Sequence, residues 1–185
     1  MTPLKLQPAV QHLLAGHVIA YPTEGVWGFG CDPNNEAAVH RLLKLKQRDI
    51  RKGLILVAAT SEQFAPYLEG LDDSYRQKFS RPTTVPTTWL VPDNGCAPAW
   101  IRGEFSSVAL RVSTHSVVRA LSQGFGGPIV SSSANVAGQP AALWPWQLHR
   151  FLGHGLDCIA PGNLLAAGRP SEIRDLLTDK VLRQA

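Results

Sequence analysis

Short apolar runs alternate along the chain with segments whose apolar residues recur at helical spacing. Residues 54–58, Leu-Ile-Leu-Val-Ala, form a continuous apolar run, which is typical of a strand covered on both faces. Similar runs predict strands over residues 17–21, 88–91, 108–112 and 128–133. Apolar spacing predicts helices over residues 8–15, 116–123 and 146–152, a helix from Asn34 or Asn35 to about Lys46, and one capped by Ser61. This alternation predicts an α/β fold with helices packed on a sheet.

The composition fits one globular domain that spans residues 1–185. An apolar fraction of 44% is enough to fill a core, and it excludes disorder as the main state. The 16 glycines and 14 prolines indicate many tight turns. Lys and Arg number 18 against 14 Asp and Glu, and the net charge of +4 suggests an anionic partner such as a nucleotide or a nucleic acid.

The three cysteines, Cys31, Cys96 and Cys158, lie far apart and form no Cys-x-x-Cys pair. This spacing argues for a reducing compartment and against a disulfide framework or a structural zinc site. No apolar run approaches the roughly 18 residues of a membrane span, and the first residues lack the apolar core of a signal peptide. We therefore expect a soluble, cytoplasmic protein that does not bind membranes.

The densest charge run, residues 41–52, holds six basic residues and one acidic residue. The predicted helix stops near Gln47, because a strand begins by Leu54. If the chain is extended beyond the helix, Lys46 and Arg48 project to the same side, and such a pair suits a phosphate chain. The alternative is a solvated helix face whose cations complement the helix dipole. The pattern alone leaves both interpretations open.

A hydroxyl-rich segment, Ser131-Ser-Ser-Ala-Asn135, ends the strand predicted over residues 128–133. Ser131, Ser133 and Asn135 share one face because side chains alternate along a strand. Small donors at the end of a strand suit a ligand crevice, where bulky side chains would block entry. The alternative is a turn in which these polar groups bond only to nearby backbone.

The segment around Gly28-Phe29-Gly30 has glycines that could let the backbone approach a ligand, but it lacks the spacing of a dinucleotide fingerprint. There is no Gly-x-x-x-x-Gly-Lys-Ser/Thr loop, so ATP would not be bound as in P-loop enzymes. The six histidines show no His-Glu-x-x-His spacing, and the three serines lack a nucleophile elbow. The five tryptophans are packing residues or platforms that stack on a base.

Taken together and in order, these segments carry a resemblance that each alone does not. Tyr21-Pro-Thr-Glu24, Lys46-Gln-Arg48 and Ser131-x-Ser133-Ala-Asn135 resemble the threonylcarbamoyl-AMP synthase family, also called the YrdC/TsaC family. The similarity continues through residues 52–54, 109–112 and 170–175, and it is to the short, single-domain branch. One loop departs: residues 81–89 lack the family's usual Trp-Pro-Gly-Pro-x-Thr segment, although Pro86 and Thr88 keep its spacing.

The resemblance implies a twisted mixed sheet with flanking helices around a large basic cleft. It also implies an enzyme that joins L-threonine, bicarbonate and ATP into threonylcarbamoyl-adenylate, with release of pyrophosphate and water. Downstream partner proteins would then transfer the threonylcarbamoyl group to tRNA. Mg²⁺ would accompany ATP by bridging its phosphates, without a dedicated protein metal site.

The resemblance also assigns roles to individual residues. Lys46 and Arg48 would clamp the phosphates as catalytic residues, because phosphoryl transfer depends on positioning and charge stabilisation. The residues implied for ATP are Lys46, Arg48, Thr88, Ser133 and Asn135. Those implied for threonine are Thr23, Arg111, Ser131 and Ser171, with Arg111 also a candidate for a phosphate. Lys52 and Arg174 have no assigned role.

Three other functions compete with this one. An RNA-binding module would use a basic concave surface and show steep salt dependence without any effect of ATP. A different carbamoyl-transfer enzyme would accept carbamoyl phosphate in place of threonine. A binding subunit whose site has decayed would be favoured only by the altered loop at residues 82–88.

Overall fold

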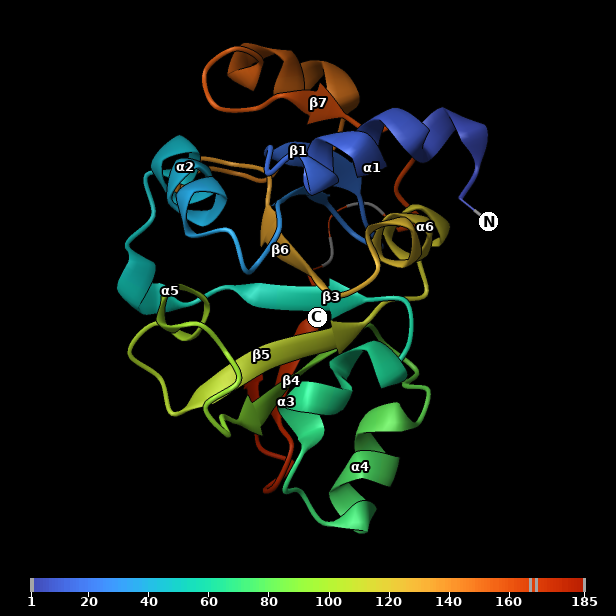
Figure 1. The fold of residues 1–185 in the computed structure, drawn as a ribbon, viewed down its shortest axis with the longest axis vertical. Helices are drawn as coiled ribbons and strands as arrows, with labels where there is room; N and C mark the ends of the chain where they lie inside the picture. The colour runs from blue at the N-terminus through green and yellow to red at the C-terminus, as the bar shows by residue number, and fades with distance from the viewer. Residues whose placement is uncertain (1, 167, 169, 185) are drawn as a thin grey trace.

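The α/β prediction is confirmed by a computed structural model, which describes residues 2–166, 168 and 170–184 (Figure 1). The described strands form one mixed sheet of nine, in the order β7-β1-β2-β6-β3-β5-β4-β8-β9. The β1–β7, β3–β5 and β4–β8 pairs are parallel, and the other pairs are antiparallel. The strands are β1 (Ile19–Pro22), β2 (Trp27–Gly30), β3 (Ile55–Ala58), β4 (Thr87–Pro92), β5 (Ser107–Val112), β6 (Ile129–Ser133), β7 (Cys158–Ile159), β8 (Glu172–Asp175) and β9 (Val181–Arg183).

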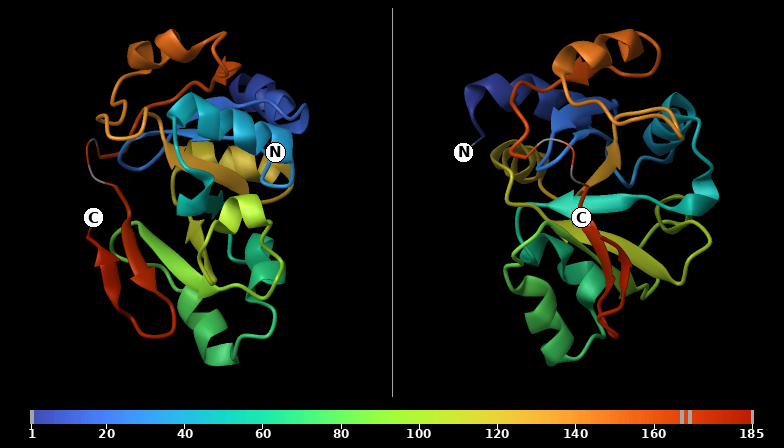
Figure 2. Two further views of the ribbon diagram at one scale, coloured as in Figure 1. Left: turned by 90° about the vertical axis from the view of Figure 1, so that its left-hand side faces the viewer. Right: turned by 180° about the vertical axis from the view of Figure 1, so that it is seen from behind.

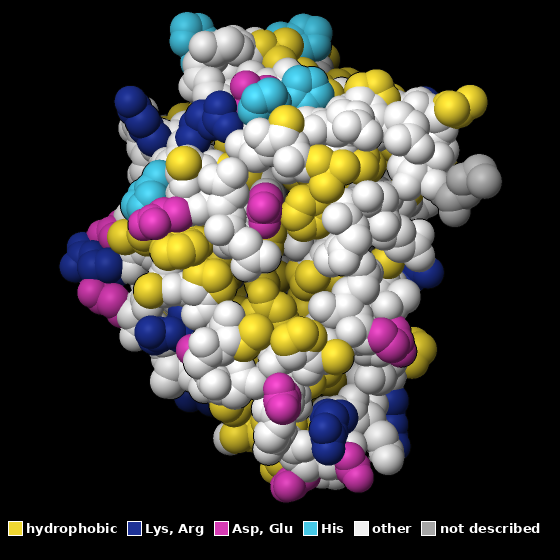
Figure 3. All heavy atoms as spheres, in the orientation of Figure 1, with side chains coloured by type: hydrophobic (Ala, Val, Ile, Leu, Met, Phe, Trp, Pro, Cys, Tyr) yellow, Lys and Arg dark blue, Asp and Glu magenta, His cyan; other side chains and the backbone are white. Residues whose placement is uncertain are grey.

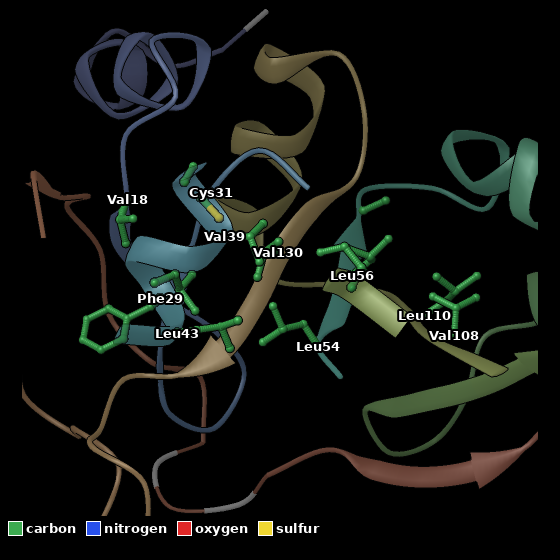
Figure 4. Close-up of a cluster of buried hydrophobic side chains, with 14 of the residues drawn as sticks. Val18, Phe29, Cys31, Val39, Leu43, Leu54, Leu56, Val108, Leu110 and Val130 are labelled. Carbon is green, nitrogen blue, oxygen red and sulfur yellow. The ribbon is translucent and has the colours of Figure 1, made fainter. Parts of the chain in front are cut away.

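Helices cover both faces of the sheet's central strands, as the apolar run of β3 predicts. Leu56 and Ala58 belong to one buried cluster and Val57 to the other, so successive residues of β3 face opposite layers. In Figure 4, Val39 and Leu43 of the helix after β2 gather with Phe29 in one of these layers. The α-helices are α1 (Gln7–Leu14), α2 (Glu36–Lys46), α3 (Ala65–Leu68), α4 (Asp73–Ser80), α5 (Ala99–Arg102) and α6 (Ser116–Phe125).

Helix α2 begins and ends with local hydrogen bonds that its sequence supplies. The Asn35 side chain accepts from Ala38 N at 3.0 Å, so of the two predicted candidates, Asn34 and Asn35, it is Asn35 that caps the helix. At the other end Gln47 has φ 49°, and Arg48 N donates back to Leu43 O at 3.0 Å. This left-handed turn is the usual way to satisfy the last carbonyls of a helix. The assumption that the chain is extended after α2 is therefore wrong, because it reverses at Gln47.

Several elements differ from the sequence prediction. Strand β2 was not predicted, because two of its four residues are glycines that hide the alternation of a strand. Helix α4 was not predicted either, since Phe79 is its one buried residue. The helix predicted over residues 146–152 is a 3-10 helix, η4 (Pro145–Phe151). Ser61 precedes another short 3-10 helix, η3 (Glu62–Phe64), but its side chain makes no capping bond.

The remaining described elements are two 3-10 helices, η1 (Leu4–Leu6) and η2 (Ile50–Lys52), the second lying between α2 and β3. Strands β8 and β9 lie on the side of the molecule away from the viewer of Figure 1, as the rear view in Figure 2 shows. Cys31, Cys96 and Cys158 are all free thiols. Over the described ranges, no helix has the length and apolar character needed to cross a bilayer.

Candidate active site

A cavity of about 610 Å³ lies against the sheet and is lined by residues of β2, β3, β4, β5, β6, β8 and β9. Its walls come from the segment after β1, the segment between α2 and β3, the end of β6, and strands β5, β8 and β9. The polar and charged residues that line it are Thr23, Glu24, Arg48, Lys52, Arg102, Ser107, Arg111, Ser131, Ser132, Ser133, Asn135, Gln139, Ser171 and Arg183. Five of these side chains are cationic and one is a carboxylate, so the cavity suits an anionic ligand.

Three of the arginines, Arg48, Arg102 and Arg111, have a buried Nε that makes no hydrogen bond to a described residue. That of Arg102 lies 3.1 Å from Asp93 Oδ2 in an ion pair, whereas those of Arg48 and Arg111 have no such partner. Arg48 donates through Nη2 to Gly53 O at 2.9 Å and Lys52 O at 3.1 Å, but its Nε makes no hydrogen bond within the described structure. Arg111 Nε is likewise buried and makes no hydrogen bond to a described residue. Burial lowers the pKa of Arg48, and burial together with Arg111 lowers the pKa of Arg183. Unsatisfied buried donors are costly, and an anion in the cavity would satisfy them.

Glu24 fixes the position of Arg111. Its Oε1 accepts from Ser113 Oγ at 2.6 Å and from Thr114 N at 3.2 Å, while its Oε2 lies 3.7 Å from Arg111 Nη1. Burial alone would raise the pKa of Glu24, but Arg111 and the Ser113 hydroxyl outweigh burial and hold that pKa below its ordinary value. The pair therefore stays ionised, with Arg111 held at the cavity wall.

Thr23 and Ser131 both lie close to Gly28. A Cβ on Gly28 would sit 3.5 Å from Thr23 Cγ2 and 3.7 Å from Ser131 Oγ, and all three residues line the cavity. Gly30 has a different reason to be glycine: a Cβ there would meet Val130 O at 2.4 Å. Of the two glycines, only Gly28 lies where backbone can approach a ligand.

The last residue of β6 and the six that follow it, 133–139, form a segment that we call the β6 loop. Within it, Ser133 Oγ donates to Asn135 Oδ1 at 2.6 Å, and Asn135 Nδ2 donates to Gln139 O at 2.5 Å. Lys46 contacts this loop and not the cavity: its Nζ donates to Ser133 O, to Asn135 O at 3.1 Å and to Asn135 Oδ1 at 3.2 Å. Burial, and secondarily Arg48, lower the pKa of Lys46 to about 7, whereas the three oxygen acceptors favour its charged form.

Thr88 and Ser171 are joined at the base of β8. Thr88 is fully buried and does not line the cavity, and its Oγ1 lies 2.8 Å from Ser171 Oγ. Ser171 O accepts from Arg183 Nη2 at 2.6 Å, which ties the end of β9 to the cavity wall. Thr88 can therefore act on a ligand only through Ser171.

The structure brings together most of the residues singled out from the sequence. Those that line the cavity are Thr23, Arg48, Lys52, Arg111, Ser131, Ser133, Asn135 and Ser171. Lys46, Thr88 and Arg174 do not, and Arg174 instead pairs with Glu172 at 2.8 Å. Sequence reasoning missed Arg102 and Arg183, whose short flanking segments carry no motif. The altered loop still reaches the cavity through Pro86, whose carbonyl accepts from Glu172 N at 2.9 Å.

Comparison with known proteins identifies the architecture around this cavity. The family model described as "Telomere recombination", that of the Sua5/YciO/YrdC proteins, matches residues 11–185. The chain belongs to the Sua5/YciO/YrdC family.

Members of the Sua5/YciO/YrdC family are similar to this chain over nearly its whole length. A protein of Cellvibrio japonicus named threonylcarbamoyl-AMP synthase is 50% identical over 175 residues, which cover 95% of this chain and 93% of that one. A protein of the same name from Chromohalobacter salexigens is 48% identical and covers 97% of each chain. The crystal structure of P. abyssi Sua5 complexed with L-threonine matches with a TM-score of 0.86 at 27% identity, over 96% of this chain and 53% of that longer one.

Proposed function

We propose that this protein is a threonylcarbamoyl-AMP synthase, which makes threonylcarbamoyl-adenylate and pyrophosphate from L-threonine, bicarbonate and ATP. The observation that carries this proposal is the cavity itself: five cations and a row of hydroxyls surround one carboxylate that is already paired. Such a site suits a ligand with several negative charges. The two relatives described above, which carry this name over nearly their whole length, support the same assignment.

The chemistry asks little covalent work of the protein. Bicarbonate loses water to supply CO₂, and the threonine amine takes up this CO₂ and gives up a proton to form a carbamate. A carbamate oxygen then attacks the α-phosphorus of ATP while pyrophosphate leaves. Catalysis then depends on holding the reactants in line and on neutralising charge in the transition state. Arg48 lines the cavity with an unpaired buried Nε, and it would bind phosphate oxygens. Ser133 and Asn135 lie at the same wall and would contact the phosphates.

Threonine would occupy the part of the cavity around Gly28. Thr23 and Ser131 offer hydroxyls there, and the buried Arg111 guanidinium offers a charge for the threonine carboxylate. Ser171 lies at the same cavity and is held by Thr88 and Arg183. The complex of P. abyssi Sua5 with L-threonine makes this amino acid the natural first ligand to test.

Magnesium would enter with ATP as the MgATP substrate. Glu24 is the one carboxylate among the described residues that line the cavity, and it is engaged by Ser113 and Arg111. Phosphate oxygens and water would therefore supply the Mg²⁺ ligands, as is common for this ion.

The product would be consumed by partner proteins that transfer the threonylcarbamoyl group to tRNA. We place this reaction in the cytoplasm, where the three free thiols would persist.

Direct RNA binding is the second candidate function. On the face seen in Figure 3, Lys and Arg side chains lie beside Asp and Glu at the left edge and form no continuous basic area. An RNA backbone would therefore have to bind at the cavity, whose cations attract any anion, and its binding would fall steeply with salt.

The direct test is to detect the product. The protein is incubated with MgATP, L-threonine and bicarbonate, and the mixture is examined by mass spectrometry for threonylcarbamoyl-adenylate and by radiolabel for incorporation of bicarbonate carbon. We expect a product that carries both threonine and the labelled carbon. ATP consumption that yields no labelled adenylate would contradict the proposal, and tight RNA binding without turnover would favour the second candidate.

A further inference from the structure

The Lys46 side chain points away from the cavity and into the β6 loop. It is the last residue of α2, it is buried, and its Nζ lies near the Phe29 ring at 5.9 Å from the ring centroid. Three oxygen atoms accept from Nζ, namely Ser133 O, Asn135 O and Asn135 Oδ1. A lysine ammonium has three donors, so none is left for a ligand in this arrangement.

Lys46 also holds the β6 loop through its backbone. Its carbonyl accepts from Ala137 N at 2.7 Å, two residues beyond Asn135. The end of α2 therefore binds the loop at Ser133 and Asn135 through the Lys46 side chain, and at Ala137 through the Lys46 carbonyl. Because the acceptors gather around a charge outside the cavity, their negative ends are turned away from the place where an anion would bind.

These contacts also decide which way the Asn135 amide faces. Oδ1 accepts from both Lys46 Nζ and Ser133 Oγ, and Nδ2 donates one hydrogen to Gln139 O. A primary amide has a second N–H, and it stays free in this orientation. Without Lys46, the amide could turn its oxygen toward the cavity, where it would repel phosphate.

We propose that Lys46 is a positioning residue, which holds the β6 loop so that the remaining Asn135 N–H can reach the phosphates, and which does not touch the phosphates itself. This inference rests on the proposed function for its effect on ATP. Its structural part concerns the free protein and stands apart from any activity.

Hydrogen exchange in the free protein tests the structural part. In Lys46→Met, we expect the amides of Asn135 and Ala137 to exchange at least about tenfold faster. The backbone bonds that these two amides make remain possible, but the loop that carries them loses its three contacts to the ammonium and opens more often. Protection in α6 and β3, outside the loop, should change little. Lys44→Met is the matched control, since Lys44 is exposed on the same helix. Unchanged exchange at Asn135 and Ala137 in Lys46→Met would overturn the proposal, whatever the enzyme assay shows.

A double-mutant cycle with Asn135→Ala tests how Lys46 acts on ATP. Each single variant should reduce kcat/KM for ATP by about 10- to 100-fold. The double variant should then have about the same kcat/KM as the more impaired of the two single variants. The KM for threonine should move less than the KM for ATP. Additive losses with an unchanged loop would mean that Lys46 contacts the phosphates directly. If Lys46→Met does not fold, Lys46→Arg enters the same cycle, because a planar guanidinium keeps the charge but cannot place one nitrogen on all three oxygens.

Discussion

Arg48 lies at the cavity wall with one buried nitrogen unpaired, and it is the side chain whose loss should most directly remove charge from the site. In Arg48→Ala we expect turnover to fall by about 10²–10³-fold, the usual cost of losing one preorganised donor to a developing charge. Stability should change little, because its other bonds go to exposed or half-buried backbone. The measurement is the steady-state rate with saturating threonine and bicarbonate.

Arg51→Ala is the matched control for Arg48→Ala. Arg51 is 65% exposed, pairs with Asp49 and does not line the cavity. We expect near-normal turnover in this variant. Near-normal turnover in Arg48→Ala as well would rule out a role of Arg48 at the phosphates.

Glu24 gives the site a pH dependence of stability with a definite sign. The pKa of Glu24 in the folded protein lies below its ordinary value in the unfolded chain. The stability that the ionised carboxylate contributes is therefore fully present above the unfolded-state pKa and is lost as pH falls through the folded-state pKa. We expect Glu24→Gln to lower the free energy of unfolding by about 1.5–3 kcal/mol at neutral pH, with the difference shrinking in acid.

Urea titrations at neutral and acid pH measure the effect of Glu24→Gln, with Glu69→Gln as the control because Glu69 is exposed. A constant difference between wild type and Glu24→Gln at both pH values would show that the carboxylate is not ionised in the folded protein.

At the level of single residues, the sequence could predict the polar groups that recur near one another along the chain. Ser131, Ser133 and Asn135 share a strand end, and all three line the cavity. The sequence could not predict that Glu24 would pair with Arg111 and Ser113, which lie 87 and 89 positions away. Nor could it show that the Lys46 amine turns behind the β6 loop, because that depends on how α2 packs.

The turn at the end of α2 sets the direction of the chain between Lys46 and Arg48. Gln47 has a left-handed backbone with φ 49°, and its side chain is exposed. Glycine adopts this conformation without the clash of a Cβ. We expect Gln47→Gly to raise the free energy of unfolding by about 1 kcal/mol and to leave activity intact.

Gln47→Val should have the opposite effect, because a β-branched residue is strained in that conformation. Urea unfolding measures both effects: the midpoint should be higher than that of the wild type in Gln47→Gly and lower in Gln47→Val. Equal midpoints for glycine and valine would contradict the left-handed turn.

Elements were predictable where one apolar pattern extended over several residues. Helix α2 has inward Val39, Leu42 and Leu43, which the sequence predicted, and its cap is Asn35, one of the two candidates that the sequence offered. The run at 54–58 likewise predicted β3. The helix predicted after Ser61 is η3 continued by α3. The four-residue α5 and the short strands β7, β8 and β9 escaped prediction, because segments of this length are held by their neighbours more than by their own pattern.

The whole cavity carries more positive than negative charge, which predicts a difference between its two organic substrates. ATP is strongly anionic, whereas threonine is a zwitterion without net charge. Added salt screens attraction between charges, so we expect KM for ATP to rise several-fold as KCl is raised from about 0.05 M to about 0.5 M. KM for threonine should change much less. Equal sensitivity of the two constants would contradict a cationic phosphate site.

The measurement that tests the central claim most directly is pyrophosphate release from MgATP, with L-threonine and bicarbonate omitted in turn. In the proposed reaction the carbamate of threonine forms first and then attacks ATP. Pyrophosphate release should therefore require both L-threonine and bicarbonate and stop when either is absent. Release that needs neither would show that the cavity hydrolyses ATP without making the adenylate. No release under any condition would mean that this cavity does not carry out the reaction proposed for it.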